Sequence, residues 1–107
     1  MNFINLTPHV VTIQTSNGTV TIQPSGTVAR VSMTSNVVNT LPNGIQVYNT
    51  TYGQTTGLPS SPQSNTVYIV SGLVRSVANN APHLASPHGL VRNSSGQVVG
   101  CQGLAMG

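Results

Sequence analysis

Short runs of β-branched residues, separated by turn-forming residues, recur along the chain and limit its fold more than any other feature. The first two runs, residues 9–14 and 19–23, flank Asn17-Gly18. An Asn-Gly dipeptide in this position predicts a β-hairpin with a type I′ turn, because both residues accept positive φ angles. Further strands are expected at four places, namely residues 27–33, residues 45–50, residues 66–70, and a closing hairpin of residues 90–93 and 97–101.

One helix is expected directly after the strand at residues 66–70. Apolar residues recur with helical spacing between Leu73 and Ala78, and Ser71 is a suitable N-cap. Asn79-Asn80, which comes shortly before a proline, marks the end of the helix.

Three segments are expected to be loops, namely residues 34–43, the polar stretch 51–65 and residues 81–89, which contain two prolines and two histidines. With 107 residues the chain is expected to form a single domain, residues 1–107. The predicted fold is mostly β: a small barrel or sandwich-like antiparallel sheet of about six or seven short strands with one short helix.

The chain contains no Asp and no Glu, and this absence excludes several classes of chemistry. Glycosidases and aspartic proteases need paired carboxylates, and Ca²⁺ and Mg²⁺ prefer carboxylate oxygens as ligands. We therefore expect a protein that is not an enzyme and has no cofactor. Cys101 is the only cysteine, so no intrachain disulfide can form, and its apolar neighbours indicate a buried side chain.

Resistance to acid follows from the same absence. Acid unfolding mostly reflects protonation of carboxylates that are paired or hydrogen-bonded in the folded state. In this chain only the C-terminal carboxylate and three histidines change charge in acid. We predict nearly constant stability from about pH 2 to pH 5, measured as the melting temperature at a series of pH values. A steep fall of the melting temperature within this range would contradict the prediction.

The net charge of +3 comes from three arginines, none of which has a side-chain carboxylate to pair with. A guanidinium matches the geometry of phosphate or carboxylate, a tyrosine ring can stack on a base, and N–H groups at a helix start can bind an anion. If they converge, these groups would form a pocket for one small anionic ligand; otherwise they are separate surface side chains. The candidate ligand-binding residues are Arg30, Arg75, Arg92, Tyr48, Tyr52, Tyr68 and Ser71.

Other partners have weaker support in the sequence. Three arginines are too few for a nucleic-acid track, and no apolar run reaches the length of a membrane helix. His83 and His88 are the alternative metal ligands, with His9 or Cys101. They lie in a proline-containing segment without a Cys-x-x-Cys motif, so we expect no metal site. A nucleophilic pair of Cys101 with His83 or His88 is the remaining enzymatic alternative.

Several segments, taken in order, resemble a family of small uncharacterised proteins of bacteriophages, prophages and actinobacteria. The matching segments are Asn5-Leu6-Thr7-Pro8-His9, Pro24-Ser25-Gly26 with Val28-Ala29-Arg30-Val31, Tyr52-Gly53 with Gly57-Leu58-Pro59, Tyr68-Ile69-Val70-Ser71, Pro87, Val91-Arg92-Asn93 with Gly96, and Val99-Gly100-Cys101. The resemblance covers nearly the whole chain and implies a genomic context more than an activity. Relatives of that family carry Asp and Glu, for example an Asp where this chain has Asn93, which implies that the fold does not need carboxylates.

Two functions remain open on the sequence alone. The first is a non-enzymatic binding protein of a phage or mobile element, which sequesters a small anionic ligand of the nucleotide type in the host cytoplasm. The alternative is a structural or decoration protein of a virion or another exposed assembly, tolerant of acid, whose low charge lets many copies pack closely. A homo-oligomer is expected in both cases, because uncharged sheet edges lack the usual protection against edge pairing. The missing acids can also reflect engineering or habitat.

Overall fold

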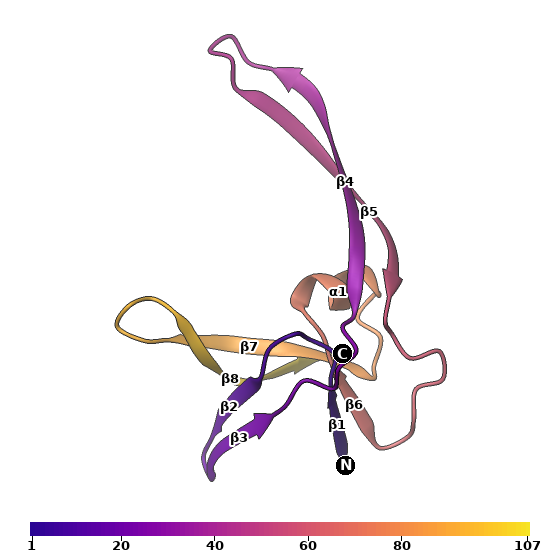
Figure 1. Cartoon of the computed structure of the whole chain (residues 1–107), viewed down its shortest axis with the longest axis vertical. Coiled ribbons are helices and arrows are strands. Elements are labelled where there is room, and N and C mark those ends of the chain that lie inside the picture. The colour runs from indigo at the N-terminus through magenta and orange to yellow at the C-terminus, as the bar shows by residue number, and fades with distance from the viewer.

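The computed structural model describes all 107 residues and confirms the mostly β prediction (Figure 1). Six strands form one curled sheet in the order β1-β6-β7-β8-β2-β3, which makes a half-barrel, and β4 and β5 form a separate two-stranded sheet. The elements are β1 (Asn2–Asn5), β2 (Val11–Thr15), β3 (Gly18–Ile22), β4 (Arg30–Thr40), β5 (Gln46–Thr56), β6 (Thr66–Ile69), α1 (Gly72–Val77), β7 (Leu84–Arg92) and β8 (Val98–Met106).

The six-stranded sheet is mixed, whereas the sequence suggested antiparallel pairing throughout. The hairpins β2–β3 and β7–β8 are antiparallel, but β1–β6, β6–β7 and β8–β2 are parallel pairs. Parallel neighbours need a crossover connection, and α1 supplies it between β6 and β7. Hairpin signals predict only pairs that are adjacent in the sequence, so they carried no information about these crossovers.

The predicted helix is confirmed. The Ser71 hydroxyl accepts the Val74 N–H at 3.2 Å and so caps α1. Asn79 and Asn80 have positive φ angles of 58° and 52°, which end the helix where the sequence predicted.

The β2–β3 hairpin is confirmed, but its turn is not type I′. The paired residues at its end are Thr15 and Gly18, so Ser16 and Asn17 form the two-residue loop. Only Gly18 has a positive φ angle (118°), whereas a type I′ turn needs positive φ at both loop residues. The Thr15 hydroxyl accepts the Asn17 N–H at 3.1 Å and donates to the Gly18 carbonyl at 2.7 Å, which stabilises this other turn.

All three segments predicted to be loops contain strand residues. Residues 34–40 continue β4, and residues 51–56 continue β5. Their many Thr, Asn and Gln side chains masked the alternation that marks a half-buried strand, because no core covers either side of this hairpin. In residues 81–89, β7 begins at Leu84 despite Pro87. Pro87 lies beyond the two residues of β7 that pair with β6, so its missing N–H leaves no ladder incomplete.

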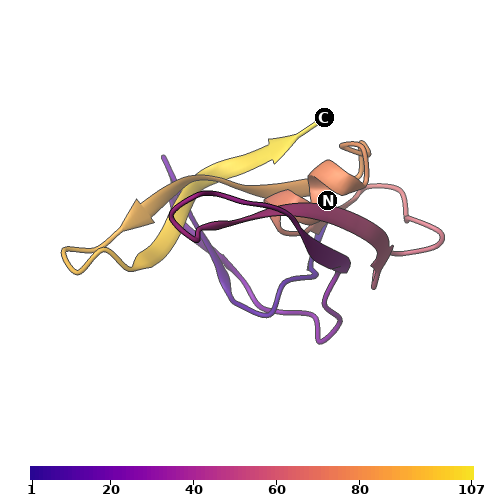
Figure 2. The same cartoon turned by 90° about the horizontal axis from the view of Figure 1, so that it is seen from above.

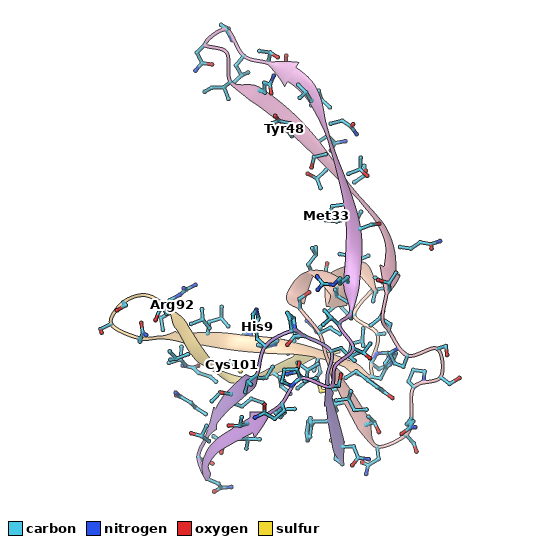
Figure 3. The ribbon with its side chains drawn as sticks, viewed as in Figure 1. His9, Met33, Tyr48, Arg92 and Cys101 are labelled. Atoms are coloured by element: carbon cyan, nitrogen blue, oxygen red, sulfur yellow. The ribbon has the colours of Figure 1, made fainter.

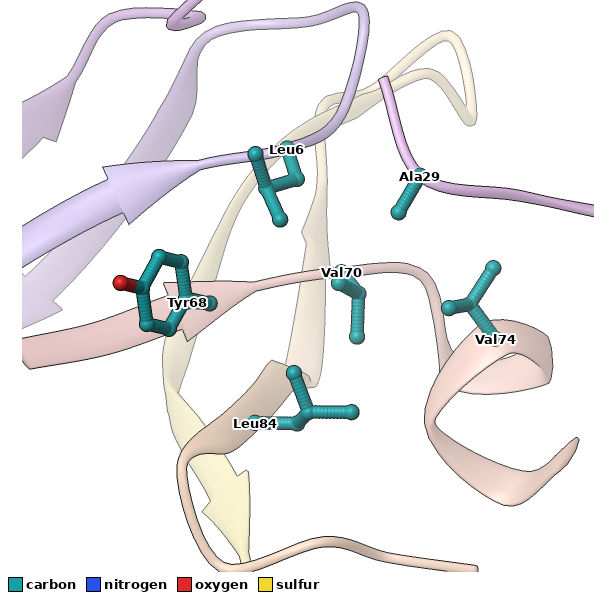
Figure 4. Close-up of a cluster of buried hydrophobic side chains, with 6 residues drawn as sticks. All are labelled: Leu6, Ala29, Tyr68, Val70, Val74 and Leu84. Carbon is teal, nitrogen blue, oxygen red and sulfur yellow. The ribbon is translucent and has the colours of Figure 1, made fainter. Parts of the chain in front are cut away.

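The core is small and gathers around β6, whose four residues are all buried. Tyr68 of this strand and Val70, which follows it, form one cluster (Figure 4). The other members of the cluster are Leu6, Ala29, Val74 and Leu84. Ile69, on the other face, packs with Val11, Ile13 and Cys101. Only 15 of 107 residues are buried, and none of them lies between residues 30 and 56. The stability of the molecule therefore comes from the six-stranded sheet with α1, which we call the body, and not from the β4–β5 hairpin.

Asn5 connects β1 to the segment that leads into the β2–β3 hairpin, and it is 1% exposed. Its Nδ2 donates to the carbonyls of His9 (2.8 Å) and Ile22 (3.1 Å). Its Oδ1 accepts the Thr7 N–H at 2.9 Å and the Thr7 hydroxyl at 2.7 Å. All four hydrogen-bonding positions of this buried amide are thus used. Three of the bonds fix the turn of residues 5–9, and the bond to Ile22 joins β1 to β3. This arrangement gives the segment Asn5-Leu6-Thr7-Pro8-His9 a structural role.

The hairpin of β4 and β5, residues 30–56, projects far from the body, and we call it the arm (Figure 1). The chain has a radius of gyration of 16.8 Å, and its longest extent is 55 Å. A compact domain of this length has a radius of gyration of about 13 Å. The solvent-accessible area is 6968 Å², whereas a compact monomer of this mass exposes about 5,700 Å². The arm thus leaves exposed the area that a compact fold would bury.

Candidate functional site

The three arginines of the predicted ligand site lie on separate elements, and no two of the predicted residues line the same pocket. Arg30 begins β4, Arg75 lies on α1, and Arg92 ends β7 near the tip of the β7–β8 hairpin (Figure 3). The chain has two pockets, and no arginine lines either of them. The Arg92 guanidinium donates to the Gly96 carbonyl at 2.9 Å and so closes its own hairpin turn.

Arg75 is the one arginine with a buried side-chain N–H that lacks an acceptor. Its Nε is buried and has no hydrogen-bond partner. The helix that carries it packs against the base of the arm. A buried N–H of a guanidinium is costly without an acceptor, and this chain has no side-chain carboxylate to offer.

Two of the predicted residues have structural roles instead. Tyr68 is 5% exposed and belongs to the core cluster. Its hydroxyl accepts the Gln63 N–H at 3.2 Å, and its ring meets that of His83 edge to face at 5.9 Å between centroids. Ser71 caps α1, as described above, so its hydroxyl is already engaged.

The histidines and the cysteine form no metal cluster. No group of three or more His, Cys, Asp or Glu side chains comes together anywhere in the structure. His83 packs on Tyr68, and His88 is exposed on β7. Cys101 is buried, as predicted, and its thiol donates to the Thr12 carbonyl at 3.5 Å.

Tyr48 and Tyr52, in contrast, lie together on one face of the arm. Met33 pairs with Tyr52, and Val37 pairs with Tyr48. Because residues two apart in a strand point to the same face, these four side chains share one side of the hairpin. Between the two pairs, the hydroxyls of Ser35 and Thr50 form a hydrogen bond at 3.0 Å. We call Met33, Val37, Tyr48 and Tyr52 the apolar arm face.

The opposite side of the arm is polar over the same length. It consists of the paired residues Thr34 and Thr51, followed by Asn36 and Asn49. The arm is therefore amphipathic, yet no part of the body covers its apolar face: Met33 is 59% exposed and Tyr48 is 58% exposed (Figure 3). A sheet face of this kind normally packs against another element.

A second group of apolar side chains lies at the end of the arm. We call Val38, Leu41, Ile45 and Val47 the arm tip, and all four are exposed. The turn between them is closed by backbone hydrogen bonds from Leu41 N–H to the Ile45 carbonyl (2.8 Å) and from Gly44 N–H to the Leu41 carbonyl (2.9 Å). The tip is thus a defined turn that presents aliphatic side chains to solvent.

An apolar pocket lies on the body, between residues 7–12 and the β7–β8 hairpin. It has a volume of about 520 Å³, and we call it the β8 pocket. Its main aliphatic side chains are Val10, Leu90, Val98 and Val99, each about half exposed. The β7–β8 hairpin, which supplies Leu90, Val98 and Val99 to the pocket, extends to the opposite end of the molecule from the loop that follows β5 (Figure 2).

The sequence pointed to Tyr48 and Tyr52 of the apolar arm face and to Ser71, which lines the β8 pocket, but it predicted neither the apolar surface nor the pocket. The alternation of Met33, Ser35 and Val37 was a usable signal, because it continues the predicted strand at residues 27–33 in the same phase. The pocket left no such signal, since it joins segments that are up to 94 residues apart in the chain.

Comparison with known proteins supplies no further assignment. The one helix, six residues long, falls short of what a helix needs to cross a membrane. No family model, no curated protein and no solved structure matches the chain.

Proposed function

We propose that this protein is a non-enzymatic structural subunit of an exposed assembly, such as a virion, and that it assembles through its arm. The observation that carries the proposal is the apolar arm face, which has no cover within the chain. An isolated two-stranded hairpin is at best marginally stable in water, and it becomes stable when one face packs on a further layer. A neighbouring molecule supplies that layer.

The surface of the chain is compatible with close packing of many copies. Its net charge is only +3, so little repulsion opposes contact between identical molecules. The arm carries a single charged residue, Arg30, at its base, and the rest of the arm is neutral. The absence of acidic side chains also suits an exposed location, because it removes the usual route of acid unfolding. The resemblance to phage proteins supports a virion as the setting.

The proposal is tested by the mass of the purified full-length chain in solution. Light scattering coupled to size-exclusion chromatography, over a range of protein concentrations, is expected to give a mass that is a multiple of 11.1 kDa. Purified particles of a phage whose genome encodes the protein are expected to contain it in many copies. A monomer at all concentrations, together with absence from particles, would reject the proposal.

Binding of a small anion remains the second candidate function, because Arg75 has a buried Nε without an acceptor. No side chain of this protein is anionic, so an anion that binds Arg75 is expected to come from another molecule. Native mass spectrometry of protein purified from cells is then expected to show an added mass that Arg75→Gln removes, while Arg92→Gln retains it. Protein without any added mass, which also ignores a panel of nucleotides, would exclude this function.

A further inference from the structure

We propose that the β8 pocket receives the arm tip of a second copy of this chain. The inference rests on the proposed structural function and adds to it the surface that each arm contacts. It joins two of the three uncovered apolar sites of the chain, the arm tip and the β8 pocket; the third is the apolar arm face.

The chemistry of the two surfaces matches. The arm tip presents four exposed aliphatic side chains and no charged group, on a turn held by two backbone hydrogen bonds. The polar Asn43 side chain of this turn accepts the Ile45 N–H at 3.2 Å. Half of the 12 residues that line the pocket are hydrophobic, among them Val10, Leu90, Val98 and Val99. The polar side chains of its lining are those of Thr7, His9, Thr12 and Ser71, and no arginine lines it. A volume of about 520 Å³ falls within the range of pockets that enclose small ligands, so it suits a few side chains of a turn.

The tip cannot reach the pocket of its own chain. Strands of 11 residues carry the tip about 35 Å from the base of the arm. The base is fixed to the body, because Ala29 N–H donates to the Leu6 carbonyl at 2.8 Å and Val31 packs on the core. Figure 1 shows the arm and the β7–β8 hairpin leaving the body in different directions. The occupant of the pocket therefore comes from another molecule.

Charge favours a second copy over an unrelated protein as that molecule, and the exposed area is large enough for a stable contact. About a quarter of the residues of an ordinary protein are charged, and burying such groups against a neutral surface is costly. A second copy offers a neutral arm instead. The chain exposes about 1,300 Å² more than a compact monomer of its mass, which lies in the range of 1,200–2,000 Å² that stable interfaces bury.

A contact between two different surfaces of identical chains is heterologous. Each copy has one arm and one pocket, so the contact repeats from molecule to molecule. Such repeats close into a ring or continue as a filament, depending on the rotation between neighbours. Either outcome is a multi-copy assembly of the kind proposed above.

Cysteine cross-linking of two full-length variants tests this contact. An Ile45→Cys chain labelled with ¹⁵N is mixed with an unlabelled Val99→Cys chain, oxidised, digested and analysed by mass spectrometry. The reference pair replaces the second variant by Val20→Cys, since Val20 on β3 is 46% exposed and Val99 is 49% exposed. We expect at least about tenfold more disulfide between positions 45 and 99 than between positions 45 and 20, because an interface holds the thiols together. Native Cys101 is buried, and a mixture of labelled and unlabelled chains without added cysteines measures the disulfides that Cys101 forms by itself.

A second measurement needs no cysteine in the pocket. Leu90→Gln is expected to lower the association constant about tenfold or more, whereas Val20→Gln leaves it unchanged; melting temperatures report whether both variants fold. Equal cross-linking of the two pairs in an assembled protein would overturn the contact but leave assembly through the arm intact. Dominant links between two copies of position 45 would overturn it in favour of packing between arms. A protein that stays monomeric would overturn the proposed function as well.

Discussion

A chain in which residues 35–50 are replaced by Asn-Gly is expected to fold normally but to remain monomeric where the full-length chain assembles. Thr34 and Thr51 are paired across the arm, so a two-residue turn can join them without changing the register. All of the removed residues are exposed, which leaves the core unchanged. Light scattering measures the loss of assembly, and the melting temperature is expected to stay within a few degrees of that of the full-length chain.

A single substitution on the apolar arm face tests whether this face forms the contact without shortening the arm. Tyr48→Thr is expected to lower the association constant about a hundredfold, because truncating a central aromatic side chain of an interface often costs 2–4 kcal/mol. Asn49→Thr is the matched control, since Asn49 is the next residue in β5 and lies on the polar side. Equal association of the two variants would show that the apolar arm face is not the contact surface.

The largest effect on stability is expected for Asn5→Ala. The substitution removes the side-chain partner of the Ile22 carbonyl and of the Thr7 N–H, and it leaves the His9 carbonyl with the Thr7 hydroxyl as its remaining donor. We expect a loss of about 3 kcal/mol in the free energy of unfolding, because buried unpaired polar groups are costly. For a chain of this size, that loss lowers the melting temperature by roughly 10–20 °C.

Asn2→Ala is the control for this prediction. Asn2 lies on the same strand, but its side chain is exposed and makes no hydrogen bond. Its melting temperature is expected to change by no more than a few degrees. Chemical denaturation, monitored by circular dichroism, measures both variants. If Asn5→Ala and Asn2→Ala were equally stable, the hydrogen bonds of Asn5 would not hold the two parts of the sheet together.

The sequence predicted those parts of the fold that depend on neighbouring residues. The β2–β3 hairpin, the strand around Tyr68, the capped helix and the closing hairpin all follow from local spacing and turn chemistry. The two strands of the arm are longer than the sequence predicts. No core covers the arm, so nothing imposes apolar alternation along its whole length. Its Thr and Asn residues were interpreted as loop residues, although Thr favours strands.

The candidate site was much less accessible to sequence reasoning. Grouping the residues by chemical type brought arginines and tyrosines together as possible ligands of an anion, but chemical type says nothing about proximity. Of these residues, only Tyr48 and Tyr52 are brought together on an exposed face, and their neighbours there are Met33 and Val37 rather than arginines. The predicted anion site therefore has no common pocket in the structure.

Composition alone determined that this protein has no acidic side chain, no intrachain disulfide and little charge, because these properties do not depend on how the chain folds. Local patterns determined that it is mostly β, because hairpins and caps involve residues close in sequence. Only the tertiary structure decided which apolar residues the core leaves uncovered. Burial depends on contacts between segments that are distant in the sequence. The β8 pocket forms because the sheet brings β2, β7 and β8 together, and the arm is exposed because its two strands lie outside that sheet.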